Sequence, residues 1–524
     1  MAGKRSFYLT TPIFYVNDVP HIGHAYNSIA CDVLARFMRL DGLRVKFLTG
    51  TDEHGQKVEK AARAAAMEPQ AFCDKVSQNF RDLGRLLNLS NDDFIRTTEP
   101  RHARACQDLW RRLKARDEIY LGTYAGWYAV RDEAFYTESE LAPGPDGKKL
   151  APSGAEVEWV EEPNYFFRLS KWQQPLLEYY AKHPSFLAPD NRRNEVTSFV
   201  AGGLKDLPVS RPSFKWGVPV PDDPKHVMYV WLDALTNYLT ALGYPNMESP
   251  DFSEFWPEAL HVVGKDILRF HAVYWPAFLM AAELAPPRRV FAHGWLLNRG
   301  EKMSKSLGNV IRPAELIAQY GLDPVRYYLL REIPFGADGY ISHETMVGRI
   351  NGDLANDLGN LVQRVLSMIN RNCAAALPEA GSFTAADDEL LRSAEAVLAE
   401  MRAHMEVPAF HRALEALWRV IGQANRYVDE QAPWALRKTD PARMATVLYT
   451  LAEAIRHIGT LVLPFMPGSG GRILDQLAVP EAARSFASLG SRGRLKPGTA
   501  LPKPEGVFPR HVEPEPGAET EAAG

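Results

Sequence analysis

Two histidines near the start of the chain have the types and spacing needed to bind a phosphate group. His21 and His24 flank Ile22 and Gly23, directly after Pro20, where a helix is expected to begin. Residues three apart share one face of a helix, and a helix N-terminus offers unpaired N–H groups to an anion. Two imidazoles add hydrogen-bond donors there, and Gly23 lets the backbone approach a nucleotide. Two exposed histidines without a function would give the same pattern, so the motif needs support from elsewhere in the chain.

A second run places two lysines in a loop that glycines flank. Lys302-Met303-Ser304-Lys305-Ser306 lies between Gly300 and Gly308, after an apolar run that is typical of a strand. Such a loop can close over a triphosphate, and its lysines can neutralise the charge that builds as pyrophosphate leaves. A solvated basic loop is the alternative. Together the two runs indicate a nucleotide site that Lys302 and Lys305 complete.

The elements around these runs predict a parallel α/β sheet. Strands are expected over Ser6–Ile13 and Val45–Gly50, with a helix from Pro20 to Arg39 between them. After a gap, strands are expected over Val227–Trp231, Leu260–Val263 and Arg289–His293, and helices follow the first two. We therefore predict a split, doubly wound, Rossmann-like sheet. Ligands bind such sheets at the carboxyl ends of the strands, which is where Asp52 stands.

The gap and the C-terminal half have different patterns. Short runs punctuated by aromatics, Gly and Pro predict a small antiparallel insertion, with a helix near Lys171–Lys182. From Pro313 onward, apolar residues recur at spacings of three and four, which predicts a helical bundle. The end of the chain, rich in Gly, Pro and Glu, predicts an extended, partly disordered tail. The predicted segments are 1–118 and 226–312 (catalytic halves), 119–225 (insertion), 313–353 (linking helices), 354–487 (bundle) and 488–524 (tail).

Composition bounds the class of protein. The chain of 524 residues is 46% hydrophobic and 24% charged with a net charge of −4, which excludes a largely disordered chain, a collagen-like chain and a disulfide-stapled miniprotein. The four cysteines contain no Cys-x-x-Cys pair, which fits a reducing compartment. The N-terminus has no signal-like apolar stretch, and the run Ala272–Ala282 is too short to span a membrane. We expect a cytoplasmic protein.

The two nucleotide-binding runs, in this order and each after a strand, resemble the paired signatures of the class I aminoacyl-tRNA synthetases. Four further segments resemble the methionyl-tRNA synthetase family: Thr11–Asn17, Gly50–Gly55, Val230–Ala234 and Gly264–His271. The resemblance extends from about Ser6 to about Pro480. It implies activation of L-methionine by ATP with Mg²⁺, then transfer to tRNA(Met), including the initiator tRNA.

The resemblance also implies site residues. Asp52 would bind the α-ammonium of methionine, and nine residues would form the pocket: Ile13, Tyr15, Trp231, Ala234, Leu235, Tyr238, Ile267, His271 and Trp275. Tyr238 and His271 would face the thioether sulfur, which is only a weak acceptor. The catalytic residues would be His21, His24, Lys302 and Lys305, with Gly23 and Ser304 also at the ATP. Core packing is the alternative for Trp231, Trp275 and His271.

One departure from the family concerns a zinc-binding knuckle that many members carry in the insertion. The matching stretches, Tyr128–Tyr136 and Pro143–Lys148, contain neither Cys nor His. We therefore predict a knuckle without zinc, held by turns and aromatic packing. The insertion is also too short for the editing domain of the isoleucine, valine and leucine enzymes, which disfavours those specificities.

The helical half carries the remaining prediction. Asn360 and Arg364 are four apart on one helix and Trp434 lies near the end of another. By resemblance these residues read the anticodon, whose splayed bases are recognised by stacking and by hydrogen bonds to their edges. A solvated helix face is the alternative. The rival functions are another class I synthetase, a non-catalytic tRNA-binding paralogue and a small nucleotidyltransferase. With no appended tRNA-binding barrel, we expect a monomer.

Overall fold

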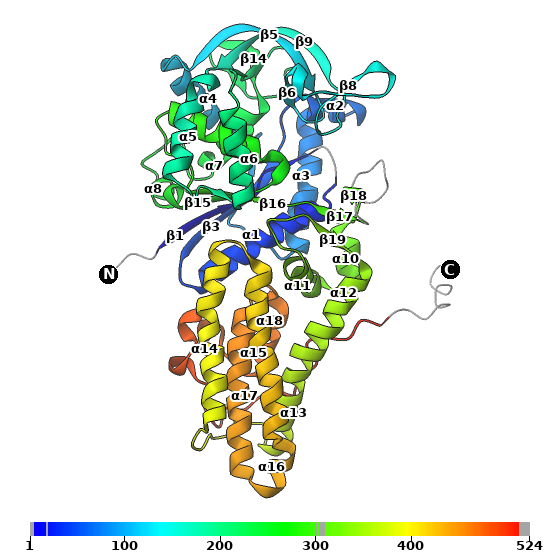
Figure 1. The fold of residues 1–524 in the computed structure, drawn as a ribbon, viewed down its shortest axis with the longest axis vertical. Helices are drawn as coiled ribbons and strands as arrows, with labels where there is room; N and C mark the ends of the chain where they lie inside the picture. Colours follow the sequence, from blue (N-terminus) through cyan, green and yellow to red (C-terminus); the bar gives the residue numbers. More distant parts are fainter. Residues whose placement is uncertain (1–4, 17–18, 299–300, 303–309, 513–524) are drawn as a thin grey trace. The chain divides into compact units, whose positions relative to one another are not determined.

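The structure, a computed structural model, describes residues 5–16, 19–298, 301–302 and 310–512. The chain forms two compact units (Figure 1). The first unit comprises residues 1–32 and 44–293, and the second comprises residues 33–43 and 294–524. No helix among the described residues is both long and apolar enough to cross a bilayer.

A parallel sheet forms the centre of the first unit. Its order is β10 (Leu187–Ala188), β16 (Arg289–His293), β15 (Ala259–Gly264), β1 (Ser6–Thr10), β3 (Arg44–Asp52) and β2 (Phe14–Tyr15), with β4 (Asp93–Arg96) also paired to β3. Because β1 and β3 precede the insertion and β15 and β16 follow it, the prediction of a split parallel sheet is confirmed. The order reverses at β1, between β15 and β3, so a ligand crevice is expected at the carboxyl ends of these strands.

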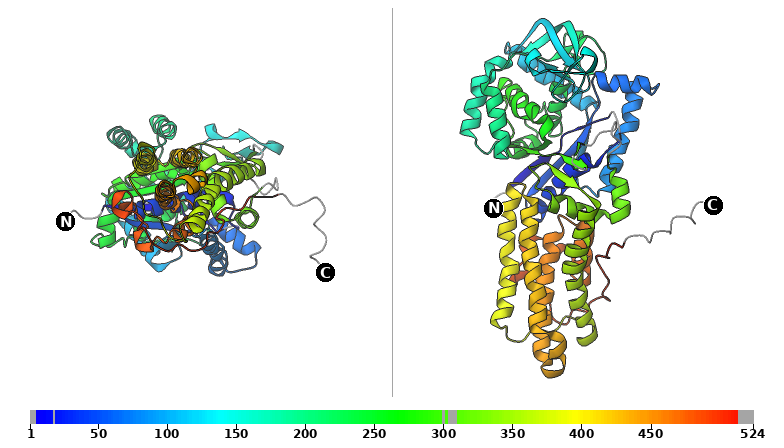
Figure 2. Two further views of the ribbon diagram at one scale, coloured as in Figure 1. Left: turned by 90° about the horizontal axis from the view of Figure 1, so that it is seen from below. Right: turned by 45° about the vertical axis from the view of Figure 1, so that its right-hand side comes forward.

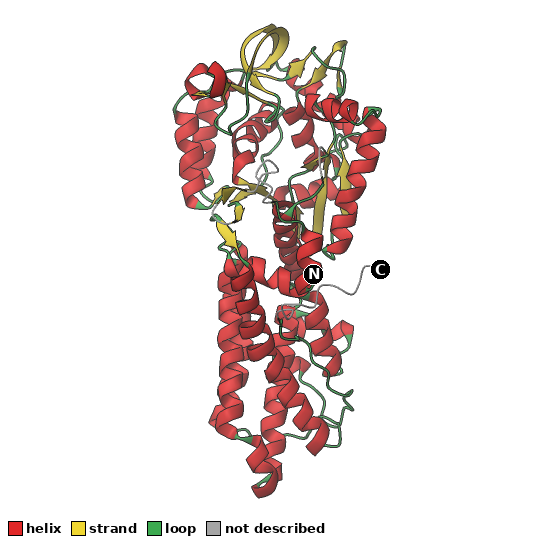
Figure 3. Cartoon of the chain, turned by 90° about the vertical axis from the view of Figure 1, so that its right-hand side faces the viewer, coloured by secondary structure: helices red, strands yellow, loops and turns green. Residues whose placement is uncertain are grey.

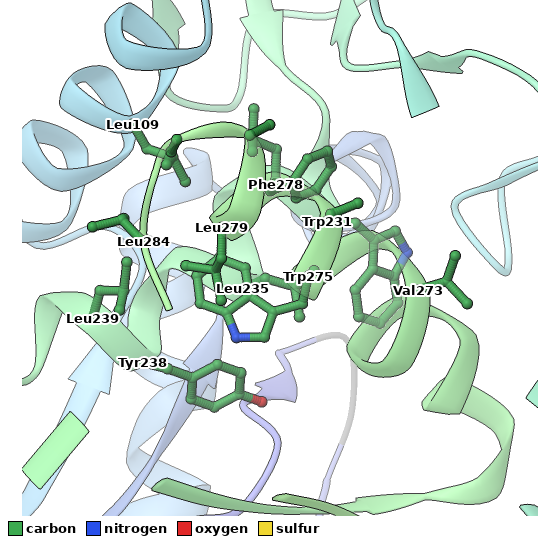
Figure 4. Close-up of a cluster of buried hydrophobic side chains, with 14 of the residues drawn as sticks. Leu109, Trp231, Leu235, Tyr238, Leu239, Val273, Trp275, Phe278, Leu279 and Leu284 are labelled. Carbon is green, nitrogen blue, oxygen red and sulfur yellow. The ribbon is translucent and has the colours of Figure 1, made fainter. Parts of the chain in front are cut away.

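The helices of this unit supply the apolar core. They are α1 (Ile22–Leu40), whose last residues count with the second unit, α2 (Gln56–Ala64), α3 (Pro69–Leu86), α4 (Pro100–Ala115), α7 (Val230–Thr240), α8 (Pro250–Phe255) and α9 (Trp275–Ala281). Every residue of α7 is buried. Figure 4 shows part of the core that α7 and α9 share, including Trp231, Leu235, Tyr238 and Trp275.

The insertion is built on a long antiparallel hairpin. Strands β5 (Ile119–Ala129) and β9 (Glu158–Phe167) pair along their length, flanked by β6 (Ala134–Tyr136) and β11 (Leu207–Pro208). A second sheet has the order β12 (Ser210–Arg211), β14 (Asp223–Met228) and β13 (Pro219–Val220). Helices α5 (Gln173–Lys182) and α6 (Asp190–Ala201) complete it, and α5 matches the helix predicted near Lys171–Lys182.

Two details of the predicted organisation are wrong. Strand β10 lies inside the predicted insertion, yet it pairs with β16 at the edge of the parallel sheet. The parallel strand predicted over Val227–Trp231 is instead the end of antiparallel β14 followed by the start of α7. A short, fully buried apolar run does not distinguish strand from helix by its periodicity.

The knuckle region keeps a compact shape through its own side chains. Two short strands, β7 (Ala142–Pro143) and β8 (Lys149–Leu150), form a hairpin, and Ala129, Ala151 and Ala155 make a small apolar core. The carboxylate of Asp132 accepts hydrogen bonds from the hydroxyls of Tyr136 and Ser153. Turns, apolar contacts and polar side chains thus hold this region together.

The second unit is mainly helical (Figure 3). It begins with a small sheet of β17 (Leu296–Asn298), β18 (Glu301–Lys302) and β19 (Gly339–Ile341). Its helices are α10 (Pro313–Tyr320), α11 (Leu322–Glu332), α12 (His343–Arg349), a π-helix (Ile350–Gly359), α13 (Asn360–Asn372), α14 (Ala385–Glu406), α15 (Phe410–Gln431), α16 (Pro433–Thr439), α17 (Pro441–Val462) and α18 (Pro467–Gln476). Helix α17 is buried almost throughout and forms the centre of the bundle.

The segment that follows the bundle is extended but packed. The backbone N–H groups of Leu377 and Leu501 donate to the carbonyls of Thr499 and Ala375. Val507 and Phe508 are buried, and Arg472 donates to the carbonyl of Val507. Residues 489–512, the described part of the predicted extended tail, therefore pack along the bundle (Figure 2).

Candidate active site

The two motif histidines lie at the N-terminus of α1 with their proton positions set by the backbone. The backbone N–H of His21 donates to Nδ1 of His24 (3.1 Å), and that of Gly23 donates to Nδ1 of His21 (3.0 Å). Desolvation lowers the pKa of both rings, and that of His24 falls well below its usual value. Each neutral ring therefore carries its hydrogen on Nε2, so both rings present an N–H donor of the kind a phosphate oxygen accepts.

Close packing around the histidines explains Gly23. The rings of His21 and His24 stack with centroids 3.9 Å apart. The rings of Phe14 and His24 are T-shaped, with centroids 4.9 Å apart. A Cβ atom at position 23 would lie 2.9 Å from Cε1 of His21. Glycine thus lets the His21 ring fold back over the first turn of the helix.

Asp52 is the last residue of β3 and is 2% exposed. Burial raises the pKa of its carboxyl well above the usual value, and the charges of Asp233 and Glu133 add to this rise, while the backbone N–H of His54 opposes it. The second carboxylate oxygen, Oδ1, has no hydrogen-bond partner among the described residues. A buried carboxylate with an unused acceptor is suited to bind a cation, because a cationic ligand would satisfy that oxygen and stabilise the ionised form.

The predicted pocket residues gather around one apolar cluster. Trp231, Leu235, Tyr238 and Trp275 belong to it, while Ile13, Tyr15 and Ile267 pack against it half-buried. Ala234 is buried on the same helix. The ring of Trp231 stacks on Phe270 with centroids 3.7 Å apart. Tyr15 lies directly beside Asp52, because β2 and β3 pair at these two residues. Burial raises the pKa of both Tyr15 and Tyr238, and the charge of Asp52 adds to the rise in each case.

Tyr238 and His271 form a hydrogen-bonded pair. Nδ1 of His271 donates to the carbonyl of Ile267 (3.0 Å), so Nε2 accepts from the Tyr238 hydroxyl (2.8 Å). Burial lowers the pKa of His271 to about 4, so the ring is neutral near pH 7. His271 lies in a π-helical turn, Phe270–Tyr274, a feature that often occurs at functional sites. In this arrangement the Tyr238 hydroxyl directs its hydrogen toward Nε2 of His271.

Several buried polar residues of this region were not predicted from the sequence. His261 stacks on Tyr238 at 4.0 Å and joins Thr10 to the Trp275 indole by hydrogen bonds of 2.9 and 3.3 Å. Glu133, from the insertion, accepts from the backbone N–H of Lys57 (3.2 Å). A Cβ atom at position 55 would lie 2.4 Å from Oε1 of Glu133, so Gly55 leaves room for this carboxylate. In the sequence Glu133 stands within an ordinary turn, and nothing there predicts this contact.

The lysine motif is described only in part. The backbone of Lys302 ends β18 and pairs with Leu297. The side chain of Lys302, together with Ser304 and Lys305, lies outside the described residues. Their predicted roles therefore rest on the motif alone.

The predicted anticodon residues lie close together in the second unit. Helix α15 ends at Gln431, the next residue, Ala432, has a left-handed conformation (φ 42°), and Pro433 begins α16. This turn leaves Trp434 48% exposed. The guanidinium of Arg364 lies 6.0 Å from the Trp434 ring centre and donates to Asp429 (3.0 Å). Asn360 is exposed one helical turn before Arg364.

A groove of about 640 Å³ lies on α15, before its C-terminal end. Its lining residues, from α11 and α15, are Arg331, Glu415, Trp418, Arg419, Gly422, Gln423 and Arg426. The Trp418 indole N–H and Gln423 Oε1 are buried without a hydrogen-bond partner within the described chain. Cationic and aromatic groups in one groove are a common feature of surfaces that bind RNA backbones.

Comparison with known proteins gives one consistent family. Residues 7–366 match the family model described as tRNA synthetases class I (M), and residues 377–520 match that of the anticodon binding domain of methionyl tRNA ligase. The methionine–tRNA ligase of Mesorhizobium japonicum is 57% identical over 515 residues, which cover 98% of this chain and 99% of the relative. The methionine–tRNA ligase of Mycobacterium tuberculosis is 53% identical over 516 residues, covering 98% and 99%.

A solved structure agrees over nearly the whole length. Mycobacterium tuberculosis methionyl-tRNA synthetase in complex with methionyl-adenylate matches with a TM-score of 0.94 at 54% identity. The match covers 97% of this chain and 100% of that chain.

Proposed function

Because the chain belongs to the methionyl-tRNA synthetase family of class I aminoacyl-tRNA ligases, we propose that the apolar cluster beside Asp52 is its methionine site. The reaction is ATP-dependent activation of L-methionine to methionyl-adenylate, followed by transfer of methionine to tRNA(Met). Membership in this family argues against another class I specificity and against a small nucleotidyltransferase. The observation that supports the proposed site best is the buried, unpaired oxygen of Asp52 at the edge of an aromatic pocket.

The pocket suits the two ends of methionine differently. The α-ammonium would pair with Asp52, in place of the missing hydrogen-bond partner. The thioether chain is flexible, apolar and polarizable, and favourable sulfur–aromatic contacts are available from Trp231, Tyr238 and Trp275. Ile13, Tyr15, Ala234, Leu235, Ile267 and His271 would complete the walls. We expect ATP–pyrophosphate exchange with methionine and none with leucine, isoleucine, valine or cysteine.

Activation requires positioning and charge stabilisation rather than a covalent enzyme intermediate. The methionine carboxylate attacks the α-phosphate of ATP, the new acyl–phosphate bond forms, and pyrophosphate leaves. The Nε2–H donors of His21 and His24 would bind phosphate oxygens beside Gly23. Lys302, Ser304 and Lys305 would bind the phosphates and stabilise the transition state. Mg²⁺ would accompany ATP, held mainly by phosphates and water.

The Tyr238–His271 pair gives the protein a defined dependence on pH. The pKa of His271 is about 4 in the folded state and about 6.5 when unfolded. Between these values the unfolded chain binds the additional proton, so this residue's contribution to stability declines as the pH falls from about 6.5 toward about 4. The decline is about 1.4 kcal/mol per pH unit.

His271→Gln should lose this part of the acid sensitivity, so its thermal midpoint should approach that of the wild type between pH 7 and pH 5. Exposed His183→Gln serves as control. A pH-independent difference between wild type and His271→Gln would contradict a neutral, buried His271.

We propose that Asn360, Arg364 and Trp434 read the anticodon, and that the groove on α15 contacts the tRNA backbone. Trp434→Ala should raise the KM for tRNA(Met) by about 5- to 150-fold, because stacking of one base on an aromatic ring contributes about 1–3 kcal/mol. Methionine-dependent ATP–pyrophosphate exchange should be unchanged, since that reaction needs no tRNA. Trp159→Ala, at another exposed tryptophan, is the matched control. Equal losses in both assays would contradict the assignment.

The remaining features are proposed on the sequence. The knuckle is expected to contain no zinc, because Asp132, Tyr136 and Ser153 hold its turns where the family's metal ligands are replaced. The four cysteines show no disulfide in the described chain, which supports a cytoplasmic location. We also propose a monomer, and the six predicted segments as the functional divisions of the chain.

A further inference from the structure

A charged residue lies in the first turn of α7, a helix of the first unit in which every residue is buried. Asp233 is 0% exposed and shares α7 with Trp231, Ala234, Leu235 and Tyr238. Its two carboxylate oxygens contact two histidines from other elements. Oδ2 lies 2.7 Å from Nδ1 of His54, after β3, and Oδ1 lies 2.7 Å from Nε2 of His102 on α4. Because an ionised carboxylate only accepts hydrogen bonds, both histidines are the donors.

His102 has a second hydrogen-bond partner on α7. Its Nδ1 lies 3.1 Å from the hydroxyl oxygen of Thr240, which itself donates to the carbonyl of Thr236 (3.0 Å). Although burial opposes ionisation, His54 and His102 hold the pKa of Asp233 well below its usual value. The result is a buried, ionised carboxylate with a histidine donor on each oxygen.

The network reaches the neighbourhood of Asp52 along the chain. His54 lies two residues after Asp52, its ring is fixed by Asp233, and it lies edge-on to the ring of Trp216 with centroids 5.5 Å apart. The backbone N–H of His54 also lowers the pKa of the Asp52 carboxyl. A side chain of α7 therefore fixes a residue that follows the end of β3. The same helix forms the wall of the proposed methionine pocket. Helix α7 therefore contributes both a contact next to Asp52, the proposed partner of the ammonium group, and the apolar wall of the pocket.

A metal ion is the alternative occupant of this cluster. His102, Cys106 and Asp233 bring three ligand atoms within 4.8 Å of one another. Tetrahedral zinc holds its ligands at about 2.0–2.3 Å from the metal, which requires wider spacing than the 2.7 Å between His102 Nε2 and Asp233 Oδ1. That spacing, and a hydrogen on His102 Nε2, favour direct hydrogen bonds.

We propose that Asp233, held by His102 and His54, is a positioning residue that orients the Asp52 carboxylate toward the α-ammonium of methionine. The proposal rests on the proposed role of Asp52. It assigns to His54, Asp233 and His102 a role in recognising the charged end of the substrate, distinct from the walls that recognise its side chain. Its specific consequence is that disrupting the network weakens binding only of ligands that carry the ammonium group.

The test compares two ligands that differ only in that group. The probes are 5′-O-(methionylsulfamoyl)adenosine and its counterpart lacking the α-amino group, with dissociation constants measured by titration calorimetry. Asp233→Asn should weaken binding of the aminated probe by about 10- to 100-fold, because small displacements of a positioned group have effects of this size. Binding of the des-amino probe should change by less than about threefold, as for sites that do not couple. Equal weakening of both probes would overturn the proposal and indicate general deformation of the pocket.

Further variants keep the result interpretable. His54 is nearer the surface than Asp233, so His54→Ala provides a second test if Asp233→Asn does not fold. His54→Asn, whose amide N–H can replace Nδ1–H, should recover most of the selectivity for the aminated probe. Glu118→Gln is the matched control: Glu118 is a buried carboxylate that binds the Trp172 indole and Lys171, away from Asp52, and its substitution should change neither probe selectively.

Two more results separate the proposal from its premise. If Asp52→Asn binds both probes as the wild type does, the proposed role of Asp52 fails. If Asp52→Asn loses the aminated probe selectively while Asp233→Asn and His54→Ala do not, only the positioning role fails. Elemental analysis of the wild-type protein should find no stoichiometric metal; one bound equivalent that Cys106→Ala removes would replace the hydrogen-bonded network by a metal site.

Discussion

Substitution of Asp52 by Asn should lower methionine-dependent ATP–pyrophosphate exchange at limiting methionine by about 30- to 5,000-fold, since losing one partner of a buried charge pair costs about 2–5 kcal/mol. The carboxamide has nearly the same shape as the carboxylate, so the pocket walls should stay in place. The substrate ammonium would then be desolvated without a counter-charge. The KM for methionine should rise accordingly, while the KM for ATP should change only slightly.

The matched control is Asp93→Asn. Asp93 begins β4, the neighbour of β3, and its carboxylate is held by Arg101 outside the proposed pocket. This variant should retain the wild-type KM for methionine. A normal KM for methionine in Asp52→Asn would show that another group binds the ammonium and that the site has been assigned to the wrong end of the crevice.

Substitution of Lys305 by Ala should lower the kcat of exchange by about 10²- to 10³-fold, the range expected when one group that stabilises transition-state charge is removed. Negative charge moves toward the leaving pyrophosphate as the α-phosphate bond breaks. A lysine that meets this charge only in the transition state contributes to kcat rather than to substrate binding. The dissociation constant for methionine should therefore be unchanged.

Lys503→Ala, at an exposed lysine of the C-terminal segment, controls for the loss of one positive charge. It should leave kcat unaltered. A rise in the KM for ATP without a loss of kcat in Lys305→Ala would assign the lysine to ground-state binding. Unimpaired exchange would move the catalytic role to Lys302.

Regular elements with a strong periodic signal were predicted well. The helical bundle predicted from Pro313 onward is present, and its helix α15 runs from Phe410 to Gln431, because its apolar face repeats at helical spacing and an Ala-Pro pair ends it. Strand and helix could not be distinguished over Val227–Trp231, where every side chain is buried and no polar residue marks a face. The pairing of β10 with β16 depends on two residues only, too few for a pattern to identify.

The candidate site divides in the same way. The family, the two nucleotide-binding runs and the side chains proposed to touch methionine could all be predicted from short motifs, because their chemistry is local. The hydrogen-bond partners of those side chains became visible only in the fold. His54 and His102 meet Asp233 across 179 and 131 positions of the chain. A hydrogen bond between buried groups produces no periodic pattern in the sequence. Each of these residues looks like an isolated polar residue within its own segment, and only the fold shows which of them bind one another.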